Sequence, residues 1–291
     1  MADPIITLDH VTFAYSGANE PALRDLSLSI EEGEYVGIVG RNGAGKTTFA
    51  LTLNGIVPNM LVGPFEGRIV VDGRDPTVTP VREMAKHVGM VFDNPEFQIS
   101  QMTVAEEVAL GLENLGIEYD EMCRRIAVAL EMVGLSGFEN RMPLALSGGQ
   151  QQRLAIASTL AMQPRILVMD EPTSNLDPIG KEEVFEVARR LNRDEGITVL
   201  MIEHEVEILA EYAHRIIVVD GGAIVANGPP HEVFAELDLL ERIGLRSPQA
   251  TELAIRLRDD FGVWSGSLPI TADEAVSRLA ERLTPRITGG H

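Results

Sequence analysis

The sequence predicts an α/β fold in which a largely parallel central β-sheet is covered by helices. Two observations indicate the sheet: short continuous apolar runs of strand length recur along the chain, and helical segments lie between several of them. A third observation is the composition, with 45% hydrophobic and 23% charged residues among 291, which is typical of globular proteins. This length accommodates one main domain with a small appendage.

The predicted strands fall into two kinds. Near the N-terminus, Ile5–Phe13 and Leu26–Ile30 alternate apolar and polar residues with period two, which indicates half-buried strands of an antiparallel subdomain. The remaining runs are apolar throughout, as in strands buried on both faces. These runs are Tyr35–Val39, Val88–Phe92, Ile166–Met169, Thr198–Ile202 and Ile216–Val219.

The middle of the chain, about residues 100–160, is predicted to be an inserted helical subdomain. In Val104–Leu112 and Met122–Val133, apolar residues recur at i, i+3, i+4 and i+7, as on one face of a helix. After Asn227–His231 the strand pattern stops, and Pro248–Phe261 and Ala272–Leu283 are helical in pattern. We therefore expect a main domain over residues 1–235 and a C-terminal helical appendage over 236–291.

Charge, cysteine usage and hydropathy exclude several classes of protein. With 24 Lys and Arg against 44 Asp and Glu, the net charge of −20 disfavours binding to nucleic acid and to anionic lipid. The single cysteine, Cys123, suits a reducing cytosol, and we expect it to be buried on a helix. The N-terminus lacks the features of a signal peptide, and no apolar run approaches the ~20 residues that cross a bilayer. Any transport role would then act through a separate membrane protein.

The strongest motif is the run Gly40-Arg-Asn-Gly-Ala-Gly-Lys46-Thr47, which fits the pattern G-x-x-x-x-G-K-[ST]. It follows the predicted strand Tyr35–Val39 and precedes a helix, as a phosphate-binding (Walker A) loop requires. Its glycines let successive N–H groups face an anion, and the helix N-terminus adds partial positive charge. Lys46 would reach the β- and γ-phosphates of a nucleotide, and Thr47 would donate an oxygen to Mg²⁺.

A second motif ends the apolar run Ile166–Met169 with two carboxylates, Asp170 and Glu171. Charged groups are costly at the end of a buried strand unless a cation or a reacting water meets them. We interpret the pair as a Walker B motif. Asp170 would hold the Mg²⁺ shell, and Glu171 would act as general base toward the water that attacks the γ-phosphate.

The segment Leu146-Ser147-Gly148-Gly149-Gln150 opens a predicted helix and resembles the signature motif of ABC ATPases. By itself the segment also fits a plain N-cap and turn ahead of a helix. Its order after Walker A and before Walker B favours the ABC interpretation. In that family the signature closes on the γ-phosphate of ATP held by the Walker A loop of a partner subunit.

Other positions match the same family. Tyr15 stands where an aromatic ring stacks on adenine, Ser174-Asn-Leu-Asp177 resembles the D-loop at the dimer interface, and His204 resembles the switch histidine that contacts the γ-phosphate. The resemblance thus implies binding of ATP and Mg²⁺. The nucleotide contacts it implies involve Tyr15, Gly40, Asn42, Gly43, Gly45, Lys46, Thr47, Thr48, Ser147, Gly148, Gly149, Gln150 and Asp177.

One position departs from the ABC pattern. After Val88–Phe92 the family carries a Q-loop glutamine, and this chain has Asp93. A carboxylate can still ligate Mg²⁺, but it cannot donate a hydrogen bond to the attacking water unless it is protonated. We expect slower or differently coupled hydrolysis.

Two further phrases resemble the energy-coupling-factor (ECF) transporter ATPases, which import vitamins and transition-metal cations. They are Asn94–Gln98 with Thr103–Asn114, and a tail that begins at Gly244 and is similar to the C-terminal dimerisation helices. The resemblance implies a second ABC ATPase subunit, in a homodimer or a heterodimer, together with a transmembrane coupling protein and a substrate-binding membrane subunit. It places the chain at the cytoplasmic face of the cell membrane.

Three alternatives stay open at this point. One is an ABC importer that receives its substrate from a soluble binding protein. Another is a non-transport ABC ATPase, although only about one hundred residues separate Lys46 from Ser147, too few for the long coiled coil of repair ATPases. The third is a non-hydrolysing subunit, which only Asp93 supports.

Overall fold

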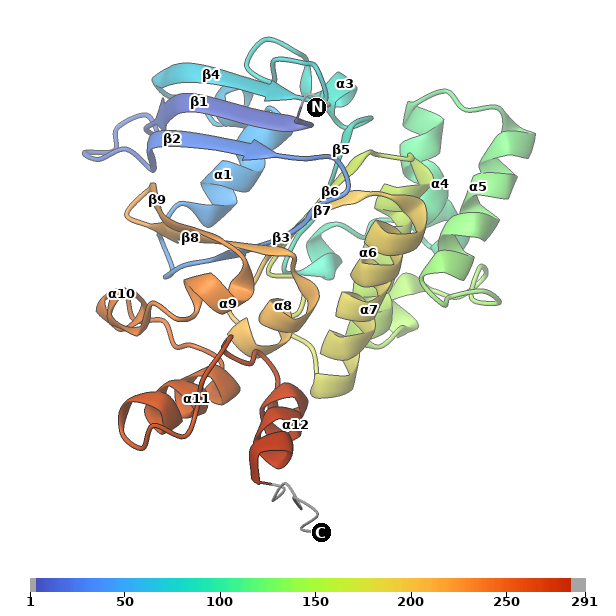
Figure 1. The fold of residues 1–291 in the computed structure, drawn as a ribbon. Helices are drawn as coiled ribbons and strands as arrows, with labels where there is room; N and C mark the ends of the chain where they lie inside the picture. The colour runs from blue at the N-terminus through green and yellow to red at the C-terminus, as the bar shows by residue number, and fades with distance from the viewer. Residues whose placement is uncertain (1–3, 284–291) are drawn as a thin grey trace.

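The computed structural model describes residues 4–283 and contains two β-sheets with helices on both sides of the larger one (Figure 1). Residues 1–3 and 284–291, which enter the predictions about the N-terminus and the appendage, lie outside the described residues. The six-stranded sheet has the order β5-β6-β7-β3-β8-β9, and the three-stranded sheet has the order β2-β1-β4. The strands are β1 (Ile6–Phe13), β2 (Leu23–Ile30), β3 (Tyr35–Val39), β4 (Phe65–Val71), β5 (Val88–Val91), β6 (Ile166–Asp170), β7 (Thr198–Ile202), β8 (Arg215–Asp220) and β9 (Ala223–Gly228).

The parallel register of the large sheet decides where functional residues meet. Strand β7 lies between β6 and β3, and Ile202 at its end is level with Asp170 of β6 and Ile38 of β3. These three strands are buried along their whole length, which explains their uninterrupted apolar sequences. The segments that follow their carboxyl ends therefore emerge side by side at one edge of the sheet.

The structure confirms the predicted α/β class and adds strands that the pattern did not indicate. The antiparallel sheet has a third strand, β4, whose first four residues are at least partly exposed and include two charged residues and Gly67. Strand β9 pairs antiparallel with β8 at the sheet edge and has no buried residue. Strand β2 begins at Leu23, three residues before the predicted start. Most residues of β4 and β9 are at least partly exposed, so neither strand has a clear apolar pattern.

The helices include the predicted insertion. Strong N-terminal signals open it: Thr103 and Glu106 form a reciprocal capping box at the start of α4. The expectation for Cys123 was wrong. It is exposed: the only buried residues of α5 are Ala129 and Leu130, near the C-terminal end of the helix, and Cys123 lies in its second turn. The helices are α1 (Lys46–Leu53), α2 (Ile56–Asn59), α3 (Val81–Met84), α4 (Val104–Asn114), α5 (Tyr119–Met132), α6 (Gly148–Ala161), α7 (Pro178–Glu195), α8 (Val206–Tyr212), α9 (Pro230–Val233), α10 (Leu237–Arg242), α11 (Gln249–Asp259) and α12 (Ala272–Leu283), with short 3₁₀ turns at Pro95–Phe97 and Pro143–Ala145.

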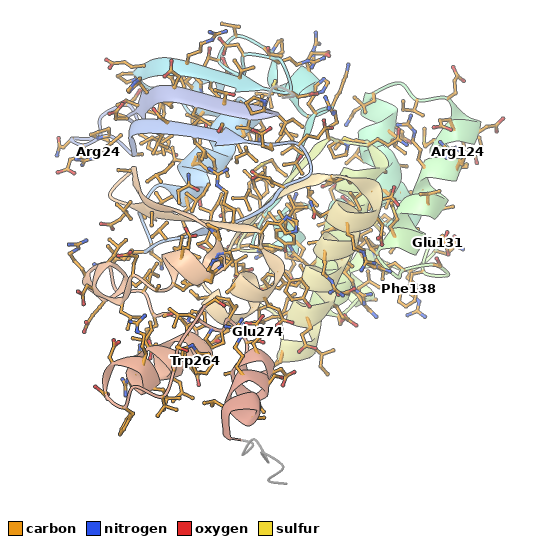
Figure 2. All side chains as sticks on the ribbon, viewed as in Figure 1. Arg24, Arg124, Glu131, Phe138, Trp264 and Glu274 are labelled. Carbon is orange, nitrogen blue, oxygen red and sulfur yellow. The ribbon has the colours of Figure 1, made fainter. Side chains whose placement is uncertain are left out.

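The large sheet separates two hydrophobic cores. Alternate residues of β3 point to opposite sides: Tyr35 and Val39 join the core beneath α4 to α7, whereas Val36 and Ile38 join α1 and the antiparallel sheet. A third, smaller core lies in the C-terminal segment around Trp264, which Figure 2 places beside α11. Within residues 4–283, no helix is both long and apolar enough to span a bilayer.

A substitution in the first core tests its contribution to stability. Phe185 of α7 is completely buried, and its ring centroid lies 5.3 Å from that of Tyr212. We expect Phe185→Ala to lower the free energy of unfolding by about 3–5 kcal/mol, because the cavity left behind adds to the lost burial. Urea denaturation followed by circular dichroism would measure this. Phe261→Ala, at a ring that is 71% exposed, is the matched control and should change stability by less than about 1 kcal/mol.

Candidate functional site

The loop that joins β3 to α1 can be built only with glycine at two of its positions. A Cβ on Gly40 would lie 2.2 Å from the carbonyl oxygen of Val219, and a Cβ on Gly45 would lie 2.5 Å from that of Ala22. Gly45 also has a left-handed φ of 104°, as does Gly43 with φ 78°. Such a backbone can turn successive N–H groups to one side, the arrangement that binds phosphate.

Lys46 is the first residue of α1 and is 5% exposed. Its Nζ donates hydrogen bonds to the carbonyl oxygens of Gly40 at 2.9 Å and Arg41 at 3.2 Å, so the side chain folds back over the loop. The same nitrogen lies 3.8 Å from Oε1 of Glu171. Burial lowers the pKa of Lys46, and the nearby carboxylates of Glu171 and Asp170 oppose this shift. The ammonium group of Lys46 is thus held between the loop and the end of β6.

Asp170 ends β6 beside Thr47 of the loop. Its side chain is buried, hydrogen-bonds to that of Thr47, and leaves the buried Oδ1 without a hydrogen-bond partner. Burial raises the pKa of Asp170, while the bond to Thr47 lowers it. An unpartnered carboxylate oxygen next to a hydroxyl fits a hard cation such as Mg²⁺. Among residues 4–283, no cluster of three or more His, Cys, Asp or Glu could hold a metal, so such an ion would take further ligands from a phosphate or water.

Glu171 and His204 form the open side of this arrangement. Glu171 adopts a left-handed φ of 53°, which is uncommon for a residue other than glycine, and its carboxylate is 28% exposed. Its Oε1 lies 2.8 Å from Nε2 of His204, which follows β7. A carboxylate oriented by an imidazole at the edge of a cavity can accept a proton from water.

A cavity of about 460 Å³ lies over the loop. Tyr15 borders it: its hydroxyl group hydrogen-bonds to Oγ1 of Thr48 at 2.9 Å, and its ring packs edge-on against Phe13. The half-buried ring is the only aromatic lining that cavity among the described residues. The lining residues are Tyr15, Ala22, Asn42, Gly43, Ala44, Gly45, Lys46, Thr47, Thr48 and Glu171.

The predicted signature segment lies elsewhere. Ser147 caps α6, since its Oγ accepts from the N–H of Gln150 at 3.4 Å and Oε1 of Gln150 accepts from the N–H of Ser147 at 3.1 Å. Ser147 and Gly148 are exposed, and a Cβ on Gly149 would lie 3.4 Å from Cα of Gly180 in α7. None of the described residues 147–150 lines the cavity above Lys46. One chain therefore does not bring the two motifs together.

Five other predicted site residues do not line the cavity: Gly40, Asp170 and His204, described above, and Asp93 and Asp177. Asp177 is exposed and caps α7, where its Oδ1 accepts from the N–H of Gly180 at 2.7 Å. Asp93 is exposed just after β5, and its carbonyl oxygen accepts from Nδ2 of Asn175 at 3.4 Å. The carboxylate of Asp93 is close enough to Asp170 to contribute to that residue's raised pKa, after the larger effect of burial.

The sequence interpretation missed Glu203 and Gln98. Glu203 is 2% exposed, and burial raises its pKa, although hydrogen bonds from Thr173 and the His204 N–H oppose the shift. A carboxylate ending an apolar strand was a usable signal, the same one that identified Asp170. Oε1 of Gln98 accepts from the N–H of Phe92, just after β5, at 2.9 Å, and its Nε2 donates to the carbonyl oxygen of Met90 in β5 at 3.2 Å, a role with no local sequence signal.

Comparison with known proteins agrees with this geometry. The family described as ABC transporter matches residues 23–174. The chain is 42% identical over 281 residues to the energy-coupling factor transporter ATP-binding protein EcfA of Methanothermobacter thermautotrophicus, covering 96% of this chain and 88% of that protein. It superposes with a TM-score of 0.74 and 31% identity on CbiO1 of Clostridium perfringens, part of the ABC transporter complex CbiONQ, covering 84% of this chain and 96% of that one.

A second solved structure is the ATP-binding cassette MJ0796, determined as a dimer in a post-hydrolysis state bound to ADP and phosphate. It matches with a TM-score of 0.67 and 30% identity, over 77% of this chain and 98% of that one. Sequence, fold and phosphate-loop geometry lead to one conclusion. This chain belongs to the ABC transporter family of ATP-binding proteins, and it is an ATPase subunit of the energy-coupling-factor type.

Proposed function

We propose that this chain binds and hydrolyses ATP at the cytoplasmic face of the cell membrane to energise an importer of a vitamin or a transition-metal cation. It would act through a transmembrane coupling protein and a substrate-binding membrane subunit. One observation carries the proposal: Lys46, Asp170 and Glu171 converge beside a cavity whose floor is a phosphate-binding loop. The relatives EcfA and CbiO1 support the transport role.

Within one chain, we assign the residues around the cavity to the nucleotide and its metal. Asp170 and Thr47 would hold Mg²⁺, with Asp93 as a further ligand. The bound ion would neutralise part of the phosphate charge. The ring of Tyr15 would stack on the adenine, and Lys46 would bind the β- and γ-phosphates. The remaining contacts from the same chain would come from Gly40, Asn42, Gly43, Gly45 and Thr48.

The hydrolytic step is assigned to Glu171 and His204. Glu171 would accept a proton from the attacking water, and the partial exposure of its side chain supports this role. His204, 2.8 Å from Glu171, would orient the carboxylate and contact the γ-phosphate.

A second ATPase subunit would complete each site with its signature segment. The exposure of Ser147 and Gly148, and their absence from the cavity lining in residues 4–283, support this assignment. MJ0796 is itself a dimeric cassette. The partner would supply Ser147, Gly148, Gly149 and Gln150, and Asp177 would contribute across the interface. We assign residues 236–291, with the small core around Trp264, to dimerisation.

Purification of the chain with its membrane partners tests the proposal. The complex is expected to retain a small organic molecule or a metal ion that mass spectrometry identifies, and ATP should drive its uptake into vesicles. A complex that transports only after a soluble binding protein is added would contradict the ECF assignment. A chain that does not turn over ATP under any condition would contradict the enzymatic assignment.

Asp93→Gln tests the departure from the family pattern. A glutamine can donate the hydrogen bond to the attacking water that Asp93 lacks. We expect hydrolysis to rise about 2- to 10-fold, the value of one such bond. ATPase rates measured with and without the membrane partner would show whether the faster hydrolysis is still controlled by that partner. Asp120→Asn, at an exposed position of α5, is the control. Unchanged rates in both states would refute a special role for Asp93.

A further inference from the structure

A buried carboxylate joins the two segments that carry Glu171 and His204. Oε1 of Glu203 accepts hydrogen bonds from the N–H of Thr173 at 3.0 Å and from its Oγ1 at 2.7 Å. Oε2 accepts from the N–H of His204 at 3.3 Å. Thr173 follows Glu171 by two residues, and His204 follows Glu203 directly. The side chain of Glu203 thus contacts both the segment of Glu171 and the segment of His204.

Together with the contacts of Glu171, these hydrogen bonds link the two segments in a closed ring of contacts. His204 Nε2 lies 2.8 Å from Glu171 Oε1 on the open side, and the N–H of Glu171 donates to the carbonyl oxygen of Ile202 at 2.9 Å. The N–H of Glu203 donates to the carbonyl oxygen of Ile38 in β3 at 3.2 Å. The ring is therefore attached to the strand that leads into the phosphate loop. A shift of either segment would move Glu171 relative to that loop.

The backbone at Glu171 needs such support. A non-glycine residue with φ of 53° occupies an unfavourable region that persists only where neighbouring contacts impose it. The two hydrogen bonds from Thr173 to Glu203 fix the backbone two residues after Glu171. A carboxylate that is 2% exposed is itself costly to bury without donors, and here it has three. A neutral apolar residue would fill the position without this cost but could not join the two segments.

We propose that Glu203 is a positioning residue for hydrolysis: its carboxylate holds the segments of Glu171 and His204 in the register that general-base chemistry requires. The inference rests on the proposed roles of Glu171 and His204. Misplacing a reacting group by about 1 Å can cost about a hundredfold in rate. Loss of Glu203 should therefore affect turnover much more than nucleotide binding.

Three variants of the full chain separate the contacts. Glu203→Ala removes all of them. Glu203→Gln can keep an oxygen that accepts from Thr173. Its NH₂ group then replaces Oε2 and cannot accept the hydrogen bond from the His204 N–H. Thr173→Val removes only the hydroxyl bond. The control is Glu205→Gln, because Glu205 is an exposed carboxylate that pairs with Lys181 and lies outside the ring.

Steady-state ATPase assays and thermal unfolding give the readout. We expect kcat to fall roughly 10- to 100-fold in Glu203→Ala and less in Glu203→Gln and Thr173→Val, with KM for ATP changed by no more than about threefold. Glu205→Gln should match the wild type. If Glu203→Ala does not fold, the two milder variants carry the test. Wild-type kcat in the folded variants, or equal losses in kcat and ATP binding that follow a lowered Tm, would overturn the proposal.

The outcomes also distinguish this inference from the proposed function. One outcome would refute only the positioning role: the wild type and the Glu203 variants hydrolyse ATP at the same rate, and the Glu171→Gln chain does not hydrolyse it. A wild-type chain without turnover would refute the enzymatic assignment itself.

Discussion

Replacing Lys46 with Ala is expected to weaken ATP binding by about a hundredfold or more and to abolish measurable hydrolysis. Among the described residues, Lys46 is the only lysine or arginine that lines the cavity, and its buried Nζ lies 3.8 Å from Oε1 of Glu171. A charge-assisted contact to phosphate contributes up to about 3 kcal/mol, which corresponds to about a hundredfold in Kd. Removal of the ammonium also leaves the carboxylates of Asp170 and Glu171 uncompensated, and both would repel a triphosphate.

Isothermal titration with a non-hydrolysable ATP analogue would measure the loss of affinity. Lys86→Ala is a suitable control, since Lys86 is an exposed lysine that pairs with Glu83 at 2.8 Å outside the cavity. The folded Lys46→Ala chain should have a Tm close to the wild type. Retained affinity in such a chain would mean that the phosphates lie elsewhere.

The parallel sheet and the polar edge at which β6 ends could be predicted from the sequence because two physical signals agreed there. Continuous apolar runs indicated strands buried on both faces, and a carboxylate pair directly after Ile166–Met169 indicated a polar edge. The structure places Asp170 level with Ile202 and next to Thr47, as this interpretation requires. By itself a carboxylate pair after a strand is a weak signal, and its combination with the loop Gly40–Thr47 is what favours the Walker B interpretation.

Other features depend on contacts between segments that are distant in sequence. β4 and β9 are half-exposed edge strands, so each lacks the full apolar pattern of a central strand. Gln98 acts by bonding the backbone of β5, and any polar side chain in a loop has a similar appearance in a sequence. Cys123 was expected to be buried because of its residue type, but residue type does not show which turns of α5 are covered, and only Ala129 and Leu130 are.

The signature segment illustrates another limit of a single chain. Ser147 and Gln150 satisfy each other as a capping box, which is a complete structural role without any ligand. Their proposed role at a nucleotide site depends on a second subunit. Ser147 is exposed at a helix N-terminus, so it is available to an anion presented by that subunit.

Glu171→Gln is the second substitution with a large expected effect, and it should separate binding from hydrolysis. The amide keeps the shape of the side chain but cannot accept a proton from water, so hydrolysis should fall by about 10²- to 10³-fold. Loss of the negative charge removes repulsion toward the γ-phosphate, so ATP affinity should be retained or improved. The 2.8 Å contact of His204 can persist, because Oε1 remains an acceptor.

Two measurements on the Glu171→Gln chain test the role of Glu171 and also the proposal that each ATP is bound between two subunits. Single-turnover assays should show bound, unhydrolysed ATP, and size-exclusion chromatography with ATP should show a stable dimer that the wild type forms only transiently. Glu131→Gln, on the exposed face of α5 (Figure 2), should behave as wild type in both. Hydrolysis at the normal rate would remove Glu171 from the chemistry. Slow hydrolysis without an ATP-dependent dimer would keep its role as base but contradict the shared site, because two γ-phosphates that persist between subunits should hold them together.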